Sequence, residues 1–207
     1  TLIELLAVIS IIVILAGLTT AAVGFVRKNV RKAVAKARFS TYMAAITVCK
    51  NDNGYYPEFG IPRKGDEDLL FPQPGDQGDW EDFWKTLYGL EAPDEWVGGR
   101  KTQLNLQEAR DFGNLKRREY VTPQEENHYK TPGGDLDWAS IRGVYKDKNK
   151  DREQVFLVID LDGDGRFENP DPKTEDKIQY INETVGFFSR ERMKNGNLGE
   201  ILFTTWN

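Results

Sequence analysis

A long, almost uncharged apolar segment at the start of the chain limits the folds open to this sequence more than any other feature. Residues 2–26 read LIELLAVISIIVILAGLTTAAVGFV and contain one ionisable side chain, that of Glu4. At about 1.5 Å per residue, a helix of this length crosses the roughly 30 Å hydrocarbon core of a bilayer. A secretory signal peptide instead needs a basic region before its apolar run and a cleavage site after it. We therefore expect a retained membrane-spanning helix.

The charged residues divide the chain into three parts. Residues 1–26 hold only Glu4, residues 27–50 hold seven basic residues and no acid, and residues 51–207 hold 32 acidic and 21 basic residues. The net charge of −5 thus averages an apolar segment, a basic stem and an acidic head. An acidic head repels phosphates, so we expect no nucleic-acid partner. One cysteine and one histidine exclude an intramolecular disulfide and a multi-histidine metal site within the chain.

The helix is expected to continue through the basic stem, residues 27–53. Five residues recur there at alternating four- and three-residue spacing and predict one apolar stripe: Ala35, Phe39, Tyr42, Ile46 and Cys49. Asn53 or Gly54 suits a left-handed cap, and Pro57 forbids continuation. The first turns after the apolar segment carry Arg27, Lys28, Arg31 and Lys32. These bases are expected to contact either lipid headgroups or the acidic heads of neighbouring subunits.

The first twelve residues, TLIELLAVISII, resemble the start of a mature type IV pilin or type II secretion pseudopilin. In that family a basic leader is cleaved after a glycine, and the new N-terminal residue, usually phenylalanine, is N-methylated. The family's glutamate is the fifth mature residue, so we expect one such residue before Thr1. The resemblance implies an assembly role for Glu4 and the N-terminal Thr1, with the glutamate pairing with the N-terminal amine of a neighbouring subunit. Opposite charges attract strongly in a low-dielectric medium, where a lone carboxylate is costly.

The end of the predicted helix carries a second resemblance, to the major pseudopilin of type II secretion. Residues 51–57 read NDNGYYP and are similar to the helix end of that branch. Many family members also have a proline about two-thirds of the way along the apolar segment, whereas this chain has none before Pro57. Whether the helix melts between Gly17 and Gly24 in a filament therefore stays open.

Residues 54–207 are expected to form an acidic globular head. An Asp N-cap and a Gly stop predict a short helix over Asp79–Gly89, and Leu104–Lys116 is a second candidate. Apolar runs predict strands at Val155–Ile159, Lys177–Ile181 and Ile201–Trp206. Four tryptophans are expected to fill the core: Trp80, Trp84, Trp96 and Trp138. The predicted fold class is α+β, with a long N-terminal α-helix, hydrophobic in its first half, packed against a C-terminal antiparallel β-sheet head.

Residues 160–171, DLDGDGRFENPD, place acids at positions 1, 3 and 5 and glycine at position 6 of a calcium-type loop. The candidate ligands are Asp160, Asp162, Asp164, the Arg166 carbonyl, Glu168 and Asp171. A β-turn is the alternative, because Asp-Gly-Asp-Gly also suits a hairpin connection. Clustered carboxylates repel one another without a cation, which favours Ca²⁺. The pseudopilin resemblance also implies calcium in the C-terminal region.

No nucleophile–base pair, phosphate loop or histidine cluster appears in the sequence, so we do not expect an enzyme. We expect a structural subunit that forms a type IV pilus-like or type II secretion pseudopilus filament of identical subunits, its head stabilised by calcium. It would be a single-pass inner-membrane protein before the pilus or secretion machinery assembles it into a periplasmic or extracellular filament. The alternative is a membrane-anchored, calcium-dependent binding or adhesion domain that does not polymerise. Secretion, motility, adhesion and DNA uptake all remain open as purposes of the filament.

Overall fold

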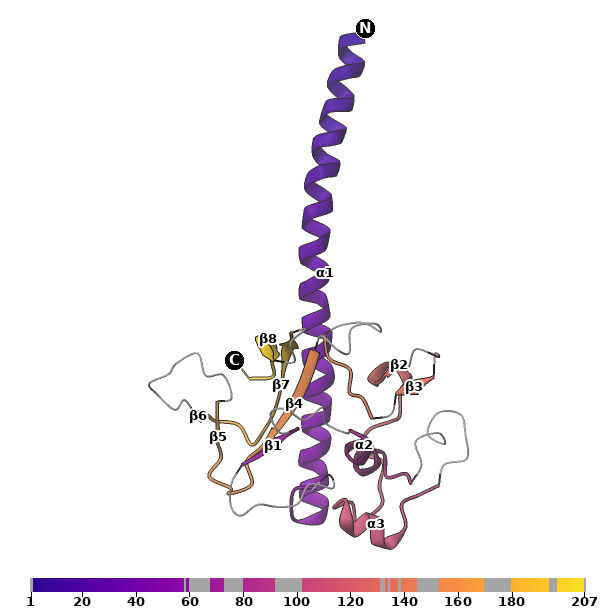
Figure 1. Cartoon of the computed structure of the whole chain (residues 1–207), viewed down its shortest axis with the longest axis vertical. Helices are drawn as coiled ribbons and strands as arrows, with labels where there is room; N and C mark the ends of the chain where they lie inside the picture. The colour runs from indigo at the N-terminus through magenta and orange to yellow at the C-terminus, as the bar shows by residue number, and fades with distance from the viewer. Residues whose placement is uncertain are drawn as a thin grey trace.

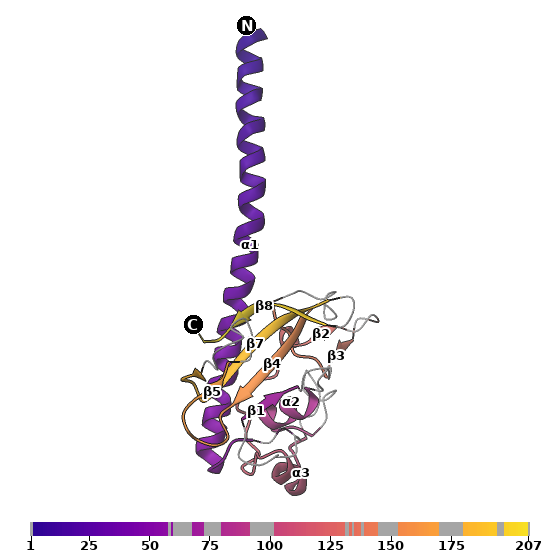
Figure 2. The same cartoon turned by 60° about the vertical axis from the view of Figure 1, so that its left-hand side comes forward.

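A computed structural model gives the architecture of the chain, and α1 (Leu2–Asn53) dominates it as a helix of 52 residues. The N-terminal half of α1 projects from the head, and its C-terminal half lies along the head, as two views agree (Figures 1 and 2). In the middle of α1, the side chains of residues 18 and 20–22 lie outside the described part. The structure describes residues 2–57, 59, 68–72, 80–91, 102–130, 133, 135–137, 139–144, 153–169, 180–193 and 197–206.

The end of α1 confirms the prediction of a glycine cap. The helix ends at Asn53, and the Gly54 N–H donates to the Lys50 carbonyl at 2.7 Å. Gly54 has a φ of 87°, the left-handed conformation that glycine adopts without steric cost. The predicted stripe is also confirmed, because Ala35, Phe39, Tyr42, Ile46 and Cys49 are all at most 1% exposed.

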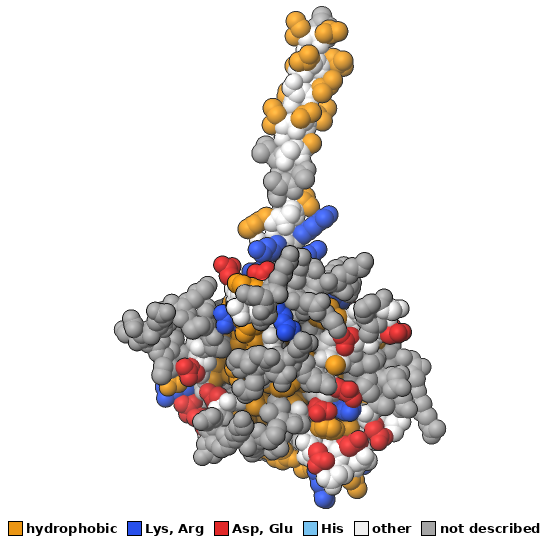
Figure 3. All heavy atoms as spheres, viewed as in Figure 1, with side chains coloured by type: hydrophobic (Ala, Val, Ile, Leu, Met, Phe, Trp, Pro, Cys, Tyr) orange, Lys and Arg blue, Asp and Glu red, His pale blue; other side chains and the backbone are white. Residues whose placement is uncertain are grey.

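The projecting half of α1 carries large apolar side chains that are exposed. Those that the structure describes between Leu2 and Phe25 are 45–80% exposed, and Figure 3 shows apolar side chains around the visible side of the helix. Within the described residues, no helix meets the combined length and hydropathy of a candidate membrane span.

The head is built on a four-stranded sheet in the order β1-β4-β7-β8, with every neighbouring pair antiparallel. The strands are β1 (Leu69–Phe71), β4 (Glu153–Ile159), β7 (Val185–Arg192) and β8 (Leu198–Thr204). Together with α1 they confirm the α+β class. The predicted runs at 155–159 and 201–206 fall in β4 and at the end of β8, whereas β1 and β7 were not predicted.

Strand β4 is buried along its whole length because both faces of the sheet are covered. Val155, Leu157 and Ile159 face the main core, which lies between the sheet, α1 and α2 (Glu81–Tyr88). Phe156 and Val158 alternate to the opposite face, in a smaller cluster completed by Phe167, Phe188 and Trp206. This alternation explains why residues 155–159 of β4 read as an unbroken apolar run.

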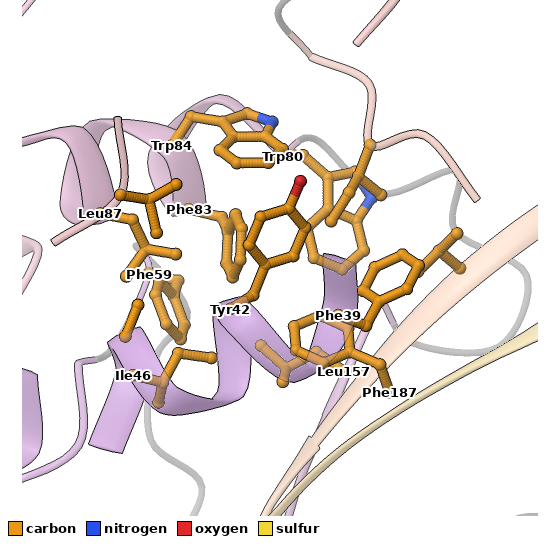
Figure 4. Close-up of a cluster of buried hydrophobic side chains, with 14 of the residues drawn as sticks. Phe39, Tyr42, Ile46, Phe59, Trp80, Phe83, Trp84, Leu87, Leu157 and Phe187 are labelled. Atoms are coloured by element: carbon orange, nitrogen blue, oxygen red, sulfur yellow. The ribbon is translucent and has the colours of Figure 1, made fainter. Parts of the chain in front are cut away.

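Aromatic rings join the three parts of the main core (Figure 4). The Tyr42 ring on α1 meets the Trp84 ring on α2 edge-on, with centroids 5.3 Å apart. On the sheet side, the Phe39 ring lies 4.8 Å from that of Phe187 on β7. The predicted packing role is confirmed for Trp80 and Trp84, which are 3% and 0% exposed, whereas Trp96 and Trp138 lie outside the described residues.

Short elements complete the head. The helix predicted over Asp79–Gly89 is α2, and Gly89 ends it at a φ of 67°, as predicted. The predicted Asp N-cap is wrong, because Trp80 holds the N-cap position without a side-chain hydrogen bond; Asp79 itself lies outside the described residues. The second predicted helix is shorter than expected: α3 (Leu106–Asp111) begins at a capping box on Asn105, and Gly113 turns left-handed soon after its end. The remaining elements are a 3-10 helix (Glu125–Asn127), β2 (Tyr129–Lys130), β3 (Leu136–Asp137), β5 (Phe167–Glu168) and β6 (Tyr180–Ile181).

Candidate metal site and assembly surface

The Asp-rich loop follows β4 and is organised around Asp160. This carboxylate is 2% exposed, and its two oxygens accept hydrogen bonds from the Gly163 N–H at 2.7 Å and the Gly165 N–H at 2.9 Å. Both glycines have left-handed φ values, 79° and 83°, so the loop curls back on Asp160 in a conformation that favours glycine. The glycines of the Asp-Gly-Asp-Gly sequence therefore let the backbone wrap around the Asp160 carboxylate.

The hairpin interpretation of this loop is wrong for the strands that flank it. β4 pairs with β1 and β7, whereas β5 pairs with β6 (Phe167↔Ile181), so the loop joins two separate sheets within the described residues.

Two of the predicted ligands lie next to a third acid that the sequence did not suggest. Asp68, Asp160 and Asp162 each offer a carboxylate oxygen, and these three oxygens lie within 4.8 Å of one another. Asp68 immediately precedes β1, 92 residues upstream of Asp160, and no local spacing marks it as a ligand. The strand pairing brings it here, since Leu69 is opposite Ile159 in the antiparallel register.

The Asp68 carboxylate is half-buried and only partly hydrogen-bonded among the described residues. Its Oδ1 atom is buried and has no hydrogen-bond partner among the described residues, while the Glu168 backbone N–H donates to the same carboxylate. Burial raises the pKa of Asp68, and the nearby charges of Asp162 and Asp160 raise it further. Hard oxygen donors of this kind are the ligands that Ca²⁺ prefers. Three oxygen donors therefore lie close together at the predicted loop, and calcium stays a prediction.

The other predicted ligands are placed differently. Asp164 forms an ion pair with Arg166 at 2.6 Å, and the hydrogen bond from this arginine lowers the pKa of Asp164. The Arg166 guanidinium also lies over the Tyr180 ring, 4.3 Å from its centroid. Glu168 is exposed on β5, and Asp171 lies outside the described residues. The structure therefore brings together Asp160 and Asp162, but not Asp164, of the predicted set.

The predicted assembly residues belong to the projecting end of the molecule. Glu4 is exposed in the first turns of α1, and Thr1 lies outside the described residues. Further along, Arg27, Lys28 and Arg31 are exposed where the helix meets the head, and Figure 3 shows basic side chains at this junction. The long apolar stretch of exposed helix is thus bounded by an acid at one end and a group of bases at the other.

The outer face of the C-terminal half of α1 is poor in charge. Lys36 and Arg38 are half-buried, and the residues between positions 33 and 48 that are exposed are all uncharged: Ala33, Val34, Ala37, Ser40, Thr41, Ala44, Thr47 and Val48. The three hydroxyls donate to carbonyls four residues earlier in the same helix, at 2.9, 3.2 and 2.9 Å. Because these donors are already satisfied, this face can be buried without leaving hydrogen bonds unmade.

No protein-family model, curated protein or solved structure matches this chain.

Proposed function

We propose that this chain is the structural subunit of a filament, of the type IV pilus or type II secretion pseudopilus kind, and polymerises through α1. The observation that carries the proposal is the projecting half of α1, where the described bulky apolar side chains from Leu2 to Phe25 are 45–80% exposed. Burying one such side chain contributes about 1.5–3 kcal/mol, so a helix carrying many of them needs an apolar environment. A bundle of identical helices supplies that environment, and the resemblance of residues 1–12 to the pilin start supports this choice.

The uncharged outer face of α1 supports the same proposal. A helix that only tethered the head would gain nothing from keeping residues 33–48 free of exposed charge. Small residues such as Ala37 and Ala44 allow helices to approach closely, and the satisfied hydroxyls permit burial. We propose that this face packs against helices of neighbouring subunits in the filament.

Before assembly, the same apolar segment would reside in the inner membrane, from which the pilus or secretion machinery would extract it. The support is its sequence, with one ionisable residue between positions 2 and 26. The bases Arg27, Lys28 and Arg31 would then lie at the headgroup level, where their charges are solvated. In the filament, Glu4 would pair with the N-terminal amine of a neighbour, which neutralises two charges that are each costly in an apolar core.

Calcium is proposed as the structural cation of the head. Asp160 and Asp162, from the predicted loop, would hold it, and it would neutralise the clustered carboxylates. The role is structural, because the site joins segments of the head and no reacting group is assigned to it.

A substitution at Glu4 tests the filament proposal. Glu4→Ala and Glu4→Gln are each expressed in the native host, with Ser10→Ala as the control in the same exposed stretch; the Ser10 hydroxyl donates to the Leu6 carbonyl of the same helix at 2.8 Å. We expect both Glu4 variants to accumulate in the membrane as monomers with no filaments in the sheared surface fraction, and Ser10→Ala to assemble normally. Normal filaments from Glu4→Ala would show that Glu4 is not needed for assembly. If wild-type cells also yield only membrane-bound monomer, the chain is a tethered binding domain.

A further inference from the structure

Four bases follow the apolar segment of α1 directly and form a compact group, which we call the basic collar: Arg27, Lys28, Arg31 and Lys32. At about 1.5 Å per residue, these four positive charges are spread over only about 8 Å of the helix axis. Arg27, Lys28 and Arg31 are exposed, and Lys32 is half-buried. The collar thus begins at the residue where the apolar segment ends.

The collar lies on the side of α1 that carries the head. Lys28 and Lys32 continue the buried stripe backward at the same alternating spacing, since Ala35 and Phe39 follow at intervals of three and four residues. Ala35 is 1% exposed and lies about one turn after Arg31. Figure 3 shows basic side chains at this junction of helix and head. The collar therefore lies next to the end of the head that is nearest to the apolar segment.

The chain does not neutralise the collar within the described residues. None of the four side chains forms an ion pair there. Arg27 and Arg31 are four residues apart, as are Lys28 and Lys32, and like charges at this spacing destabilise a helix. The collar also lies many turns from both ends of α1, so the helix dipole does not stabilise its charges. An anion from outside the chain would relieve this repulsion.

Two sources of negative charge would lie near the collar: the lipid headgroups of the membrane and the acidic heads of other copies. Some acids of the head already pair with bases of the same head. Asp52 pairs with Lys116 at 3.2 Å and with Arg118 at 2.9 Å. Asp164 pairs with Arg166 at 2.6 Å.

The position of the collar favours the lipid. An apolar segment that spans the bilayer brings the base that follows it to the level of the headgroups. Anionic phospholipids attract such a base, whereas zwitterionic phospholipids carry no net charge. A dense, one-signed group of bases at this level thus fits an anionic lipid surface.

We propose that the basic collar binds anionic phospholipid headgroups and makes the unassembled subunit selective for them. This inference rests on the membrane residence proposed above and names the class of lipid that the same helix recognises. Two tasks are then separated along α1. The apolar segment supplies insertion, and the collar supplies lipid selectivity.

Spin-labelled lipids test the collar in the full-length chain reconstituted in phosphatidylcholine bilayers. Electron paramagnetic resonance measures the fraction of labelled phosphatidylglycerol, and of labelled phosphatidylcholine, that the protein immobilises. We expect the wild type to prefer phosphatidylglycerol by at least about threefold in about 50 mM NaCl. Most of this preference should disappear in about 500 mM NaCl, where exposed charges are screened. Labelled phosphatidylserine should be preferred to a similar degree, because it carries the same charge.

Two double substitutions with the same change in charge identify the residues. Lys28→Gln/Arg31→Gln removes two collar bases, and Lys130→Gln/Arg110→Gln removes one lysine and one arginine of the head. All four side chains are exposed, so neither variant should unfold the head. We expect the collar variant to lose at least about half of the lipid preference and the head variant to keep all of it.

The outcomes separate this inference from the proposals on which it rests. Equal immobilisation of the two lipids by the wild type, or an unchanged preference in the collar variant, would overturn lipid binding by the collar and leave membrane residence intact. A collar variant that keeps the lipid preference but forms no filaments would assign the bases to neighbouring heads instead. A wild-type chain that immobilises neither lipid would overturn membrane residence as well. Polymerisation is tested separately by the Glu4 variants.

Discussion

The Phe39 ring on α1 stacks on the Phe203 ring on β8, with centroids 5.0 Å apart and an interplanar angle of 25°. Phe39 also contacts Phe187 on β7, so one side chain fastens the helix to two strands of the sheet. It is fully buried, and its removal would leave a cavity in the main core.

Phe39→Ala should therefore lower the free energy of unfolding of the head by about 3–5 kcal/mol, the usual cost of deleting a buried phenylalanine. Urea unfolding of the detergent-solubilised monomer, followed by tryptophan fluorescence, measures this change. Phe25→Ala is the matched control, because Phe25 lies on the projecting part of α1 and is 70% exposed. Its effect on the same transition should stay within about 0.5 kcal/mol. Equal losses from the two variants would mean that Phe39 does not hold the head to the helix.

Gly143 and Glu153 form a second testable pair. Both carboxylate oxygens of Glu153 accept the Val144 N–H at 2.9 Å, and a Cβ on Gly143 would overlap this carboxylate. Gly143→Ala should therefore cost about 1–3 kcal/mol of stability through overpacking. Glu153→Ala should cost a similar about 1–3 kcal/mol, because it leaves the buried Val144 N–H without its acceptor.

A double-mutant cycle separates these two effects. In the Glu153→Ala background the space beside Gly143 is vacated, so Gly143→Ala should lose most of its cost there. Additive losses in urea unfolding would show that the glycine is required for another reason.

Acid should destabilise the head through its single histidine. His128 is buried; its Nδ1–H donates to the Ser140 carbonyl at 3.3 Å, and its Nε2 accepts from the Tyr88 hydroxyl at 3.2 Å. Burial lowers the pKa of His128 to about 4, although the nearby charge of Asp137 acts in the opposite direction. An unfolded histidine titrates near pH 6.5, so between about pH 6.5 and 4 the unfolded chain binds the proton and the folded chain does not.

Stability should consequently fall as the pH drops through this window, by up to about 3 kcal/mol from His128 alone. Carboxylates titrate in the same range, so the relevant measurement is the difference in slope between the wild type and His128→Gln. The variant should bind about one proton fewer on unfolding between pH 6.5 and 4. Identical slopes would indicate that His128 is protonated in the folded head.

The parts of the fold that depend on local pattern could be predicted from the sequence. The stripe through Phe39 and Tyr42 was visible because helix periodicity places its members on one face, and Gly54 and Gly89 marked helix ends through their need for left-handed backbone. Strand β4 was visible as an apolar run. Strand β7 was missed because its C-terminal half, Ser189–Arg192, is polar and reads as surface, although it pairs with β4 over seven residue pairs.

Only the part of the candidate site that lies in one loop could be predicted from the sequence. Asp160 and Asp162 belong to one loop with recognisable spacing, whereas Asp68 joins them through the β1–β4 register, a long-range pairing that no short motif encodes. Asp164 fits the calcium pattern by position, yet its side chain is engaged by Arg166 two residues later. Sequence spacing identifies where oxygen ligands are concentrated, and tertiary pairing decides which of them converge.

Immunogold electron microscopy of the sheared surface fraction tests the central claim most directly. Antibodies raised against the head are applied to this fraction from wild-type native cells and from cells that lack the chain. We expect filaments labelled along their whole length in the wild type and none in the deletion strain, because each subunit would display one head outside a core of α1 helices. Label confined to membrane fragments, with no labelled filaments, would contradict polymerisation of the chain.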